Sequence, residues 1–198
     1  GLMNRTLHSL YCYFLALSQP VRFLDFLKHN IPVQGFTPDI EVKNNFWRQS
    51  ALWSWGFYIL GSFLEALVLM AVIFYLVNSQ GEYGSFDFLL RSQNDYILTL
   101  KLAFIWTGFK ILSFPVLLFF GNLIRFVSIR MVLGLWDGKK RESNEIWEIV
   151  GLSNTSYSFF CVPFLGKLAG EWSQFILLYR GLRWRLGWGR GKTILTIF

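Results

Sequence analysis

Four charged residues stand inside stretches of the chain that are otherwise apolar, and they are the residues best suited to chemistry. They are Glu65, Lys110, Lys167 and Glu171. A charged side chain in the hydrocarbon of a membrane is costly unless it is neutralised, paired or hydrated. Such residues either tie helices or subunits together or form a relay for protons or ions. We favour the structural tie, because transporters usually offer more carboxylates and broken helices in repeated halves.

The spacing of these residues limits how they pair. Lys167 and Glu171 are four positions apart and therefore lie on one face of a helix. Glu65 has Lys110 as a candidate partner from another apolar stretch. The small residues of the first apolar stretch recur at roughly helical spacing, which permits close packing of a neighbouring helix or of another subunit. They are Gly56, Gly61 and Ala66.

Other patterns speak against an enzyme. His8 and His29 have no Cys, Asp or Glu at metal-ligand spacing, and Cys12 and Cys161 are expected to be buried free thiols. Residues 187–193 (GWGRGKT) are spaced too closely for a P-loop, and no GxSxG or HExxH motif occurs. We therefore predict no catalytic residue, no metal and no cofactor.

Composition identifies the environment of the chain. Of its 198 residues 54% are hydrophobic and only 16% are charged, which is typical of a protein that lies in a lipid bilayer. The net charge is +7, but the basic residues flank the apolar stretches and form no continuous polar stripe, so nucleic acid is not an expected partner. We expect contacts with anionic lipid headgroups instead. The candidates are Lys139, Lys140, Arg141, Arg183, Arg185 and Arg190.

The elements that position these residues are predicted to be helices only. Apolar residues spaced by threes and fours between Leu7 and Asn30 predict an amphipathic interfacial helix, bent or divided at Pro20. Residues 53–77 predict a membrane span, with aromatic side chains at both of its ends. Residues 97–136 form one span with an interfacial helix, or two spans, because we expect interruptions at Pro115 and at 121–122.

The last third of the chain predicts a short helical pair. A helix should begin at Ser143, with acidic residues in its first turn. Two apolar stretches, 147–164 and 166–182, would then form a hairpin. Four spans place the N-terminal stretch, the 125–141 region and the tail together on the cytoplasmic side, whereas five spans do not. The expected organisation is an amphipathic segment 1–50, a transmembrane domain 51–183 and a basic aromatic tail 184–198.

Three motifs occur together in the chain. They are SQPVRFL at 18–24, LWDGK at 135–139 leading into IVGLS at 149–153, and Tyr157-Ser158 with VPFLG at 162–166, Trp172 and GLR at 181–183. As a set they resemble the Yip family, the Ypt/Rab-interacting multi-span membrane proteins. The resemblance covers roughly residues 18 to 183. It implies five spans with a cytoplasmic N-terminus, so it disagrees with the charge distribution about the tail. The long cytoplasmic arm of eukaryotic members is missing, which favours a bacterial type without a Rab-binding role.

The fold class expected is therefore an all-α, polytopic transmembrane bundle of four to five spans with an N-terminal amphipathic interfacial helix. We predict a non-enzymatic multi-pass protein of a bacterial inner membrane, which interacts with other membrane subunits or organises the membrane. The alternative is a small transporter or permease subunit that uses Glu65 and Lys110 as an intramembrane charged pair. An enzyme acting on lipid is a third and weaker option.

Overall fold

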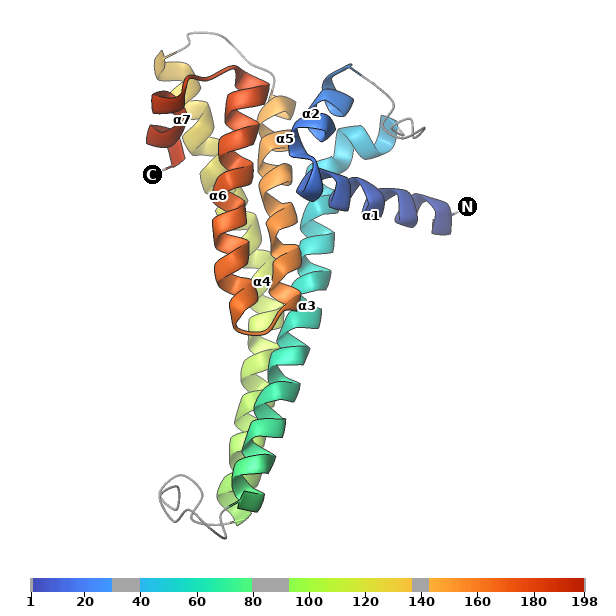
Figure 1. Ribbon diagram of the computed structural model, residues 1–198, viewed down its shortest axis with the longest axis vertical. Coiled ribbons are helices and arrows are strands. Elements are labelled where there is room, and N and C mark those ends of the chain that lie inside the picture. Colours follow the sequence, from blue (N-terminus) through green and yellow to red (C-terminus); the bar gives the residue numbers. More distant parts are fainter. Residues whose placement is uncertain (1, 30–39, 80–92, 137–142, 198) are drawn as a thin grey trace.

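The computed structural model describes residues 2–29, 40–79, 93–136 and 143–197. Within these ranges the chain is helical and contains no strand, so the all-α prediction is confirmed. Figure 1 shows two long helices, a shorter hairpin beside one half of them, and small helices at that same end. The helices are α1 (Leu2–Ser18), α2 (Pro20–His29), α3 (Ile40–Ser79), α4 (Gln93–Trp136), α5 (Ser143–Asn154), the 3-10 helix η1 (Thr155–Cys161), α6 (Leu165–Leu186) and α7 (Arg190–Ile197).

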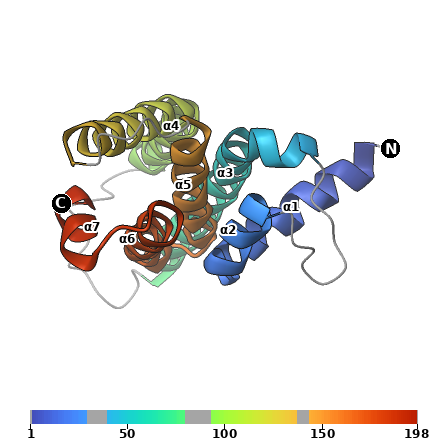
Figure 2. The same cartoon turned by 90° about the horizontal axis from the view of Figure 1, so that it is seen from above.

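The N-terminal segment is divided at Pro20, as predicted. α1 ends at Ser18 and α2 begins at Pro20, because proline lacks an N–H and suits the first position of a new helix. The side chains of Phe23 and Leu24 in α2 are buried. Phe23 packs against Phe46 of α3 with 4.5 Å between ring centroids. α1 lies across the long axis of α3 in Figure 1 and extends outward from α3 in the view from above in Figure 2, which is the orientation of an interfacial helix beside a membrane span.

Two of the described helices are long and apolar enough to cross a membrane. The stretches are Asn45–Tyr75 in α3 and Ile97–Leu135 in α4, with mean hydropathies of 2.2 and 1.9. At 1.5 Å per residue each exceeds the roughly 30 Å of a hydrocarbon core. No other described helix meets this test, so the four to five spans expected from the sequence are not confirmed.

α4 is one unbroken helix of 44 residues, and the interruptions expected at Pro115 and at 121–122 are wrong. Proline lacks an N–H, so the carbonyl of Ile111, four positions earlier, loses its usual donor. The indole Nε1 of Trp55 in α3 donates to that carbonyl oxygen at 3.2 Å. A bond from the neighbouring helix thus satisfies the acceptor that proline exposes, as helices in lipid require.

The segment α5–η1–α6 is a hairpin that reaches only part of the way along α3 and α4 (Figure 1). α5 begins at Ser143, as predicted. Hydroxyl groups shape the 3-10 helix that follows, since each donates to the carbonyl three residues earlier and so favours the tighter winding. They are Ser153, Thr155, Ser156 and Ser158, with donor–acceptor distances of 2.8 to 2.9 Å.

The hairpin approaches α3 at a glycine. A Cβ atom placed on Gly61 would collide with the backbone carbonyl oxygen of Phe160 in η1. Gly166 and Gly170 of α6 play the same part within the hairpin, against the Phe159 carbonyl and the Phe160 ring. Small residues four apart let backbones approach closely, as in membrane helix pairs. Gly56, also expected to contact a helix, has nothing within 4 Å of such a Cβ.

Candidate intramembrane charged centre

Glu65 of α3 and Lys110 of α4 form an ion pair between the two long helices. The Nζ atom of Lys110 lies 3.2 Å from Oε2 of Glu65, and the two side chains are 29% and 36% exposed. Both residues lie within the apolar stretches long enough to cross a membrane. The structure therefore brings together the two residues that the sequence offered as an intramembrane pair.

A third charged residue faces the same place. Lys167, in the first turn of α6, lines a cavity of about 220 Å³ together with Glu65 and Lys110. The other lining residues are Tyr58, Gly61, Ser62 and Phe160. We call Glu65, Lys110 and Lys167 the charged centre. It holds two ammonium groups and one carboxylate, so it carries a net positive charge when all three groups are ionised.

Aromatic side chains join α3, α4 and η1 next to this centre. Tyr58 of α3 stacks on Phe114 of α4 with 3.9 Å between ring centroids and planes 8° apart. Phe114 also meets Tyr157 of η1 edge to face at 5.3 Å, and Tyr157 meets Phe160 at 5.0 Å. Aromatic pairs in these geometries add to the energy of area burial. Tyr58, one of the aromatic residues at the end of the predicted span, is part of this helix contact.

Helix geometry gives the distance along α3 between the contact with α1 and the charged centre. The indole Nε1 of Trp53 donates to Oγ of Ser9 in α1 at 2.9 Å, and the hydroxyl oxygens of Ser54 and Tyr13 of α1 lie 3.3 Å apart. α1 therefore contacts α3 near residue 54. Eleven residues separate Ser54 from Glu65, which at 1.5 Å per residue is about 16 Å along the helix. That distance is about half of a hydrocarbon core of roughly 30 Å.

The chemistry of the centre is limited by its groups. A carboxylate and two ammonium groups can neutralise one another, exchange a proton or attract a small anion. Metal binding would need further ligands, and the described residues hold no group of three His, Cys, Asp or Glu side chains suited to a metal.

Glu171 lies apart from the charged centre. Its side chain is exposed on α6, and no ion pair joins it to Lys167 in the described part of the chain, although the two stand four positions apart. Exposed apolar side chains surround it on the same helix, among them Leu168 at 59%, Trp172 at 70% and Phe175 at 46% exposure. The carboxylate therefore stands beside exposed apolar side chains, with the exposed Lys167 one turn earlier on the same helix.

The six expected headgroup residues divide into three sets. Lys139, Lys140 and Arg141 lie outside the described residues, and Arg183 and Arg190 are exposed. Arg185 does not face outward: its side chain is 10% exposed, and its Nη2 atom lies 2.9 Å from Glu148 and 3.8 Å from Glu145 of α5. A guanidinium ion so enclosed joins α6 to α5 and is not available to headgroups.

A buried polar cluster beside the hairpin was missed from the sequence. Where α5 changes to the 3-10 helix, the carbonyl oxygen of Asn154 accepts from Ser54 at 2.7 Å and from Tyr13 at 3.3 Å. Ser54, Asn154 and Tyr13 are fully buried, so this node fixes α1, α3 and the hairpin together. Serines facing one side of the apolar stretch, Ser50, Ser54 and Ser62, were the available signal.

Comparisons with known proteins add no relative. No protein-family model, no curated protein and no solved structure matches this chain. The likeness to the Yip family therefore stays a prediction from its motifs.

Proposed function

We propose that this chain is a non-enzymatic, multi-pass protein of a bacterial inner membrane that recruits a second membrane protein through one face of α6. In this proposal α3 and α4 cross the bilayer, and α5, η1 and α6 enter it as a hairpin and return on the same side. The Yip-like motifs fit such a role in membrane organisation.

The surface of the long helices supports residence in lipid. Large apolar side chains are exposed along α3 and α4, for example Phe74 at 61%, Ile105 at 68% and Leu117 at 66%. An apolar surface of this extent is typical of a membrane or a protein interface. α1 and α2 lie at the end of the molecule that also holds α7 and the C-terminal part of α6, with the basic residues Arg180, Arg183 and Arg190. The positive-inside rule would place this end in the cytoplasm.

The observation that carries the recruitment proposal is the exposed carboxylate of Glu171. Leu168, Glu171, Trp172 and Phe175 follow the i, i+3, i+4, i+7 spacing of one helix face, which we call the α6 face. Facing lipid, Glu171 would cost about 2.5–3.5 kcal/mol on insertion scales if it lay near the bilayer centre. A partner helix carrying Lys or Arg opposite Glu171 would remove this cost and cover the apolar residues.

The test is site-specific photo-crosslinking in native membranes. A photoreactive amino acid at Trp172 should give one discrete crosslinked protein, because this position lies at the centre of the α6 face. The matched control is the same amino acid at Phe104, which is 53% exposed on α4 and away from the hairpin. The control should give lipid adducts only.

The role of the charge is tested by Glu171→Gln, which keeps the shape of the side chain. The yield of the Trp172 crosslink should fall at least about fivefold, since an ion pair in lipid is worth on the order of 1 kcal/mol or more. Equal product patterns at both positions, or a crosslink indifferent to Glu171→Gln, would refute the recruitment proposal.

The charged centre favours a second candidate, a small transporter or permease subunit for anions. Its support is the cavity of about 220 Å³ that two lysines and one glutamate line. In proteoliposomes, uptake of chloride or phosphate should then be lost in Lys167→Ala and in Glu65→Gln, while the melting temperature in detergent stays within a few degrees. Absence of uptake by the unaltered protein, or loss of assembly in Glu65→Gln, would leave the pair as a structural tie.

A further inference from the structure

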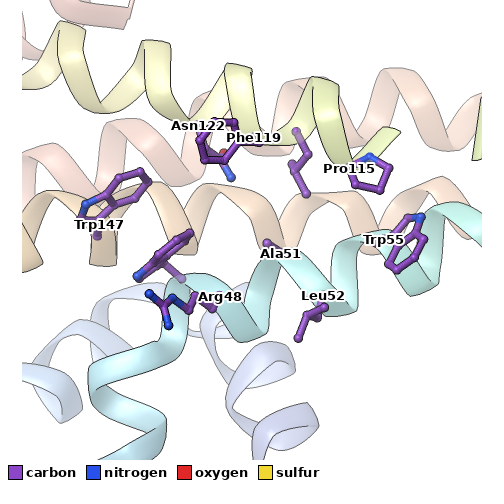
Figure 3. A pocket seen from close by; sticks show the side chains of 10 residues that line it. Arg48, Ala51, Leu52, Trp55, Pro115, Phe119, Asn122 and Trp147 are labelled. Carbon is purple, nitrogen blue, oxygen red and sulfur yellow. The ribbon is translucent and has the colours of Figure 1, made fainter. Parts of the chain in front are cut away.

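A second cavity, separate from the charged centre, lies where α3, α4 and α5 meet. It has a volume of about 350 Å³ and is lined by ten residues, most of them apolar or aromatic. Figure 3 shows them: Trp47, Arg48, Ala51, Leu52 and Trp55 from α3, Pro115, Leu118, Phe119 and Asn122 from α4, and Trp147 from α5. Leu52 and Phe119, at 65% and 55% exposure, mark where the cavity opens to the outside.

The wall of the cavity is almost entirely apolar, and its two polar lining residues, Arg48 and Asn122, lie toward one end (Figure 3). Arg48 and Trp147 lie at one end in Figure 3, and Trp55 and Pro115 lie at the other. Asn122 is 3% exposed, and its Oδ1 accepts from Arg125 at 3.2 Å, which leaves its amide nitrogen as a donor beside the cavity. The ten lining residues include no carboxylate. An occupant with an anionic end and an apolar body therefore fits.

Stacked rings build the end of the cavity near Arg48. Trp47 stacks on Trp147 at 4.6 Å between ring centroids, and Trp147 stacks on Phe126 of α4 at 4.5 Å. Arg48 and Arg130 lie over the two ends of this stack, with their guanidinium carbons 5.2 Å and 5.9 Å from the rings of Trp47 and Phe126. Cation–π contacts of this kind hold an arginine near a fixed position. Only Arg48 lines the cavity.

The position along α3 matches the boundary between headgroups and hydrocarbon. α1 contacts α3 near Ser54. The cavity begins at Trp55, next to this contact, and extends along α3 to Trp47, about 12 Å further toward the cytoplasmic end. Tryptophan and arginine are the residues that membrane proteins place at headgroup level. The Arg48 end of the cavity thus lies on the headgroup side of this boundary, and its Trp55 end lies at the boundary itself, where the acyl chains begin.

From these observations we infer that the cavity binds one anionic phospholipid, whose phosphate contacts Arg48 and Asn122 and whose acyl chain lies against Trp55, Leu118 and Phe119. A partner helix does not fit, because a helix with its side chains is about 10 Å across. The volume lies in the range of about 300–1,000 Å³ that small-molecule sites occupy. The inference rests on α3 and α4 lying in a bilayer, but not on recruitment through the α6 face.

The experiment measures lipid adducts of the full chain by native mass spectrometry in detergent. The protein is titrated with phosphatidylglycerol, with zwitterionic phosphatidylcholine, and with glycerol phosphate, which has the anionic group but no acyl chain. One saturable phosphatidylglycerol should bind. Phosphatidylcholine should bind about tenfold more weakly, and glycerol phosphate should give no adduct.

Two arginines give a matched pair of variants. Arg48→Ala should weaken phosphatidylglycerol binding about tenfold, the loss expected for one charge-assisted hydrogen bond. Arg130→Ala removes the same charge from the other end of the aromatic stack and should leave this binding unchanged. Ala51→Leu fills the middle of the cavity without altering charge, and it should reduce the binding of both lipids.

The inference is overturned if Arg48→Ala and Arg130→Ala bind phosphatidylglycerol equally, because the charge would then act from anywhere on the surface. It is also overturned if glycerol phosphate binds as well as the lipid, since the acyl chain would contribute nothing. Should Ala51→Leu unfold, the comparison of the two arginine variants decides the question without it.

Discussion

The two ends of the α3–α4 pair differ in what covers them. Toward the end that holds α1, α2 and the hairpin, the side of α3 facing the other helices carries Ser50, Ser54 and Gly61, all of them buried. Toward the other end, α3 carries large apolar residues that stay exposed, such as Leu67 at 57% and Phe74 at 61%. We call these the packed half and the bare half.

The difference shows how packing is encoded in an apolar helix. In water, large apolar residues would mark the core, but lipid solvates them as well as a protein interior does. Close contact between helices then depends on small residues that let backbones approach and on hydroxyl groups that bond across the interface. Ser54 and Gly61 serve in these two ways.

The largest effect is expected where backbones touch. Gly61→Leu places a side chain on the carbonyl oxygen of Phe160, so the hairpin must leave α3 or both backbones must shift. We expect a loss of about 3 kcal/mol or more, at the upper end of overpacking effects, because backbone atoms cannot turn aside. Thermal unfolding in detergent, followed by near-ultraviolet circular dichroism, measures it.

The control is Gly56→Leu, which makes the same change in the same helix where no atom lies within 4 Å. Both variants gain helix propensity of about 0.5–1 kcal/mol over glycine, so their difference isolates the packing effect. Equal melting temperatures for the two variants would show that the hairpin does not rest on Gly61, and the distinction between the halves would lose its main support.

The sequence predicted the helices of the packed half better than the contacts between them. The division at Pro20, the start of α5 at Ser143 and the all-α class follow from local rules and from hydropathy. Glu65 and Lys110 were brought together in the prediction because an apolar span offers a buried charge very few partners. Composition did not reveal that Arg185 turns inward, since that depends on the acids of α5.

The continuity of α4 through Pro115 is the clearest failure, and its reason is tertiary. A proline inside a helix removes one hydrogen bond, and from the sequence of α4 alone this predicts an interruption. The missing donor comes from Trp55, 56 positions away from Ile111 in the chain. No pattern within α4 carries that information.

This bond gives the next prediction, of intermediate size. Trp55→Phe keeps an aromatic side chain, although a smaller one, and removes the Nε1 donor. This leaves the Ile111 carbonyl without a partner and should cost about 1–2 kcal/mol. In a Pro115→Ala background, the new N–H at position 115 can bond that carbonyl within α4. The same tryptophan change should then cost at least about 1 kcal/mol less. A double-mutant cycle of unfolding free energies measures the coupling, and additive effects would mean that the indole does not replace the bond lost to proline.

The smallest effect tests the packed half at Cys12 of α1, which is 1% exposed. Burial raises the pKa of this thiol from its ordinary value of 9.0 to about 11. Between these values the unfolded chain has lost the proton while the folded chain keeps it, so the free energy of unfolding falls as pH rises. The loss at pH 10 relative to pH 8 should be about 1 kcal/mol. The Cys12→Ala variant has no thiol to titrate at this position. Between pH 8 and pH 10 its free energy of unfolding should therefore fall by about 1 kcal/mol less than that of the unaltered protein. Parallel curves for the two proteins would mean that the thiol is hydrated, and that α1 does not close against the hairpin and α3 as tightly as the packed half requires.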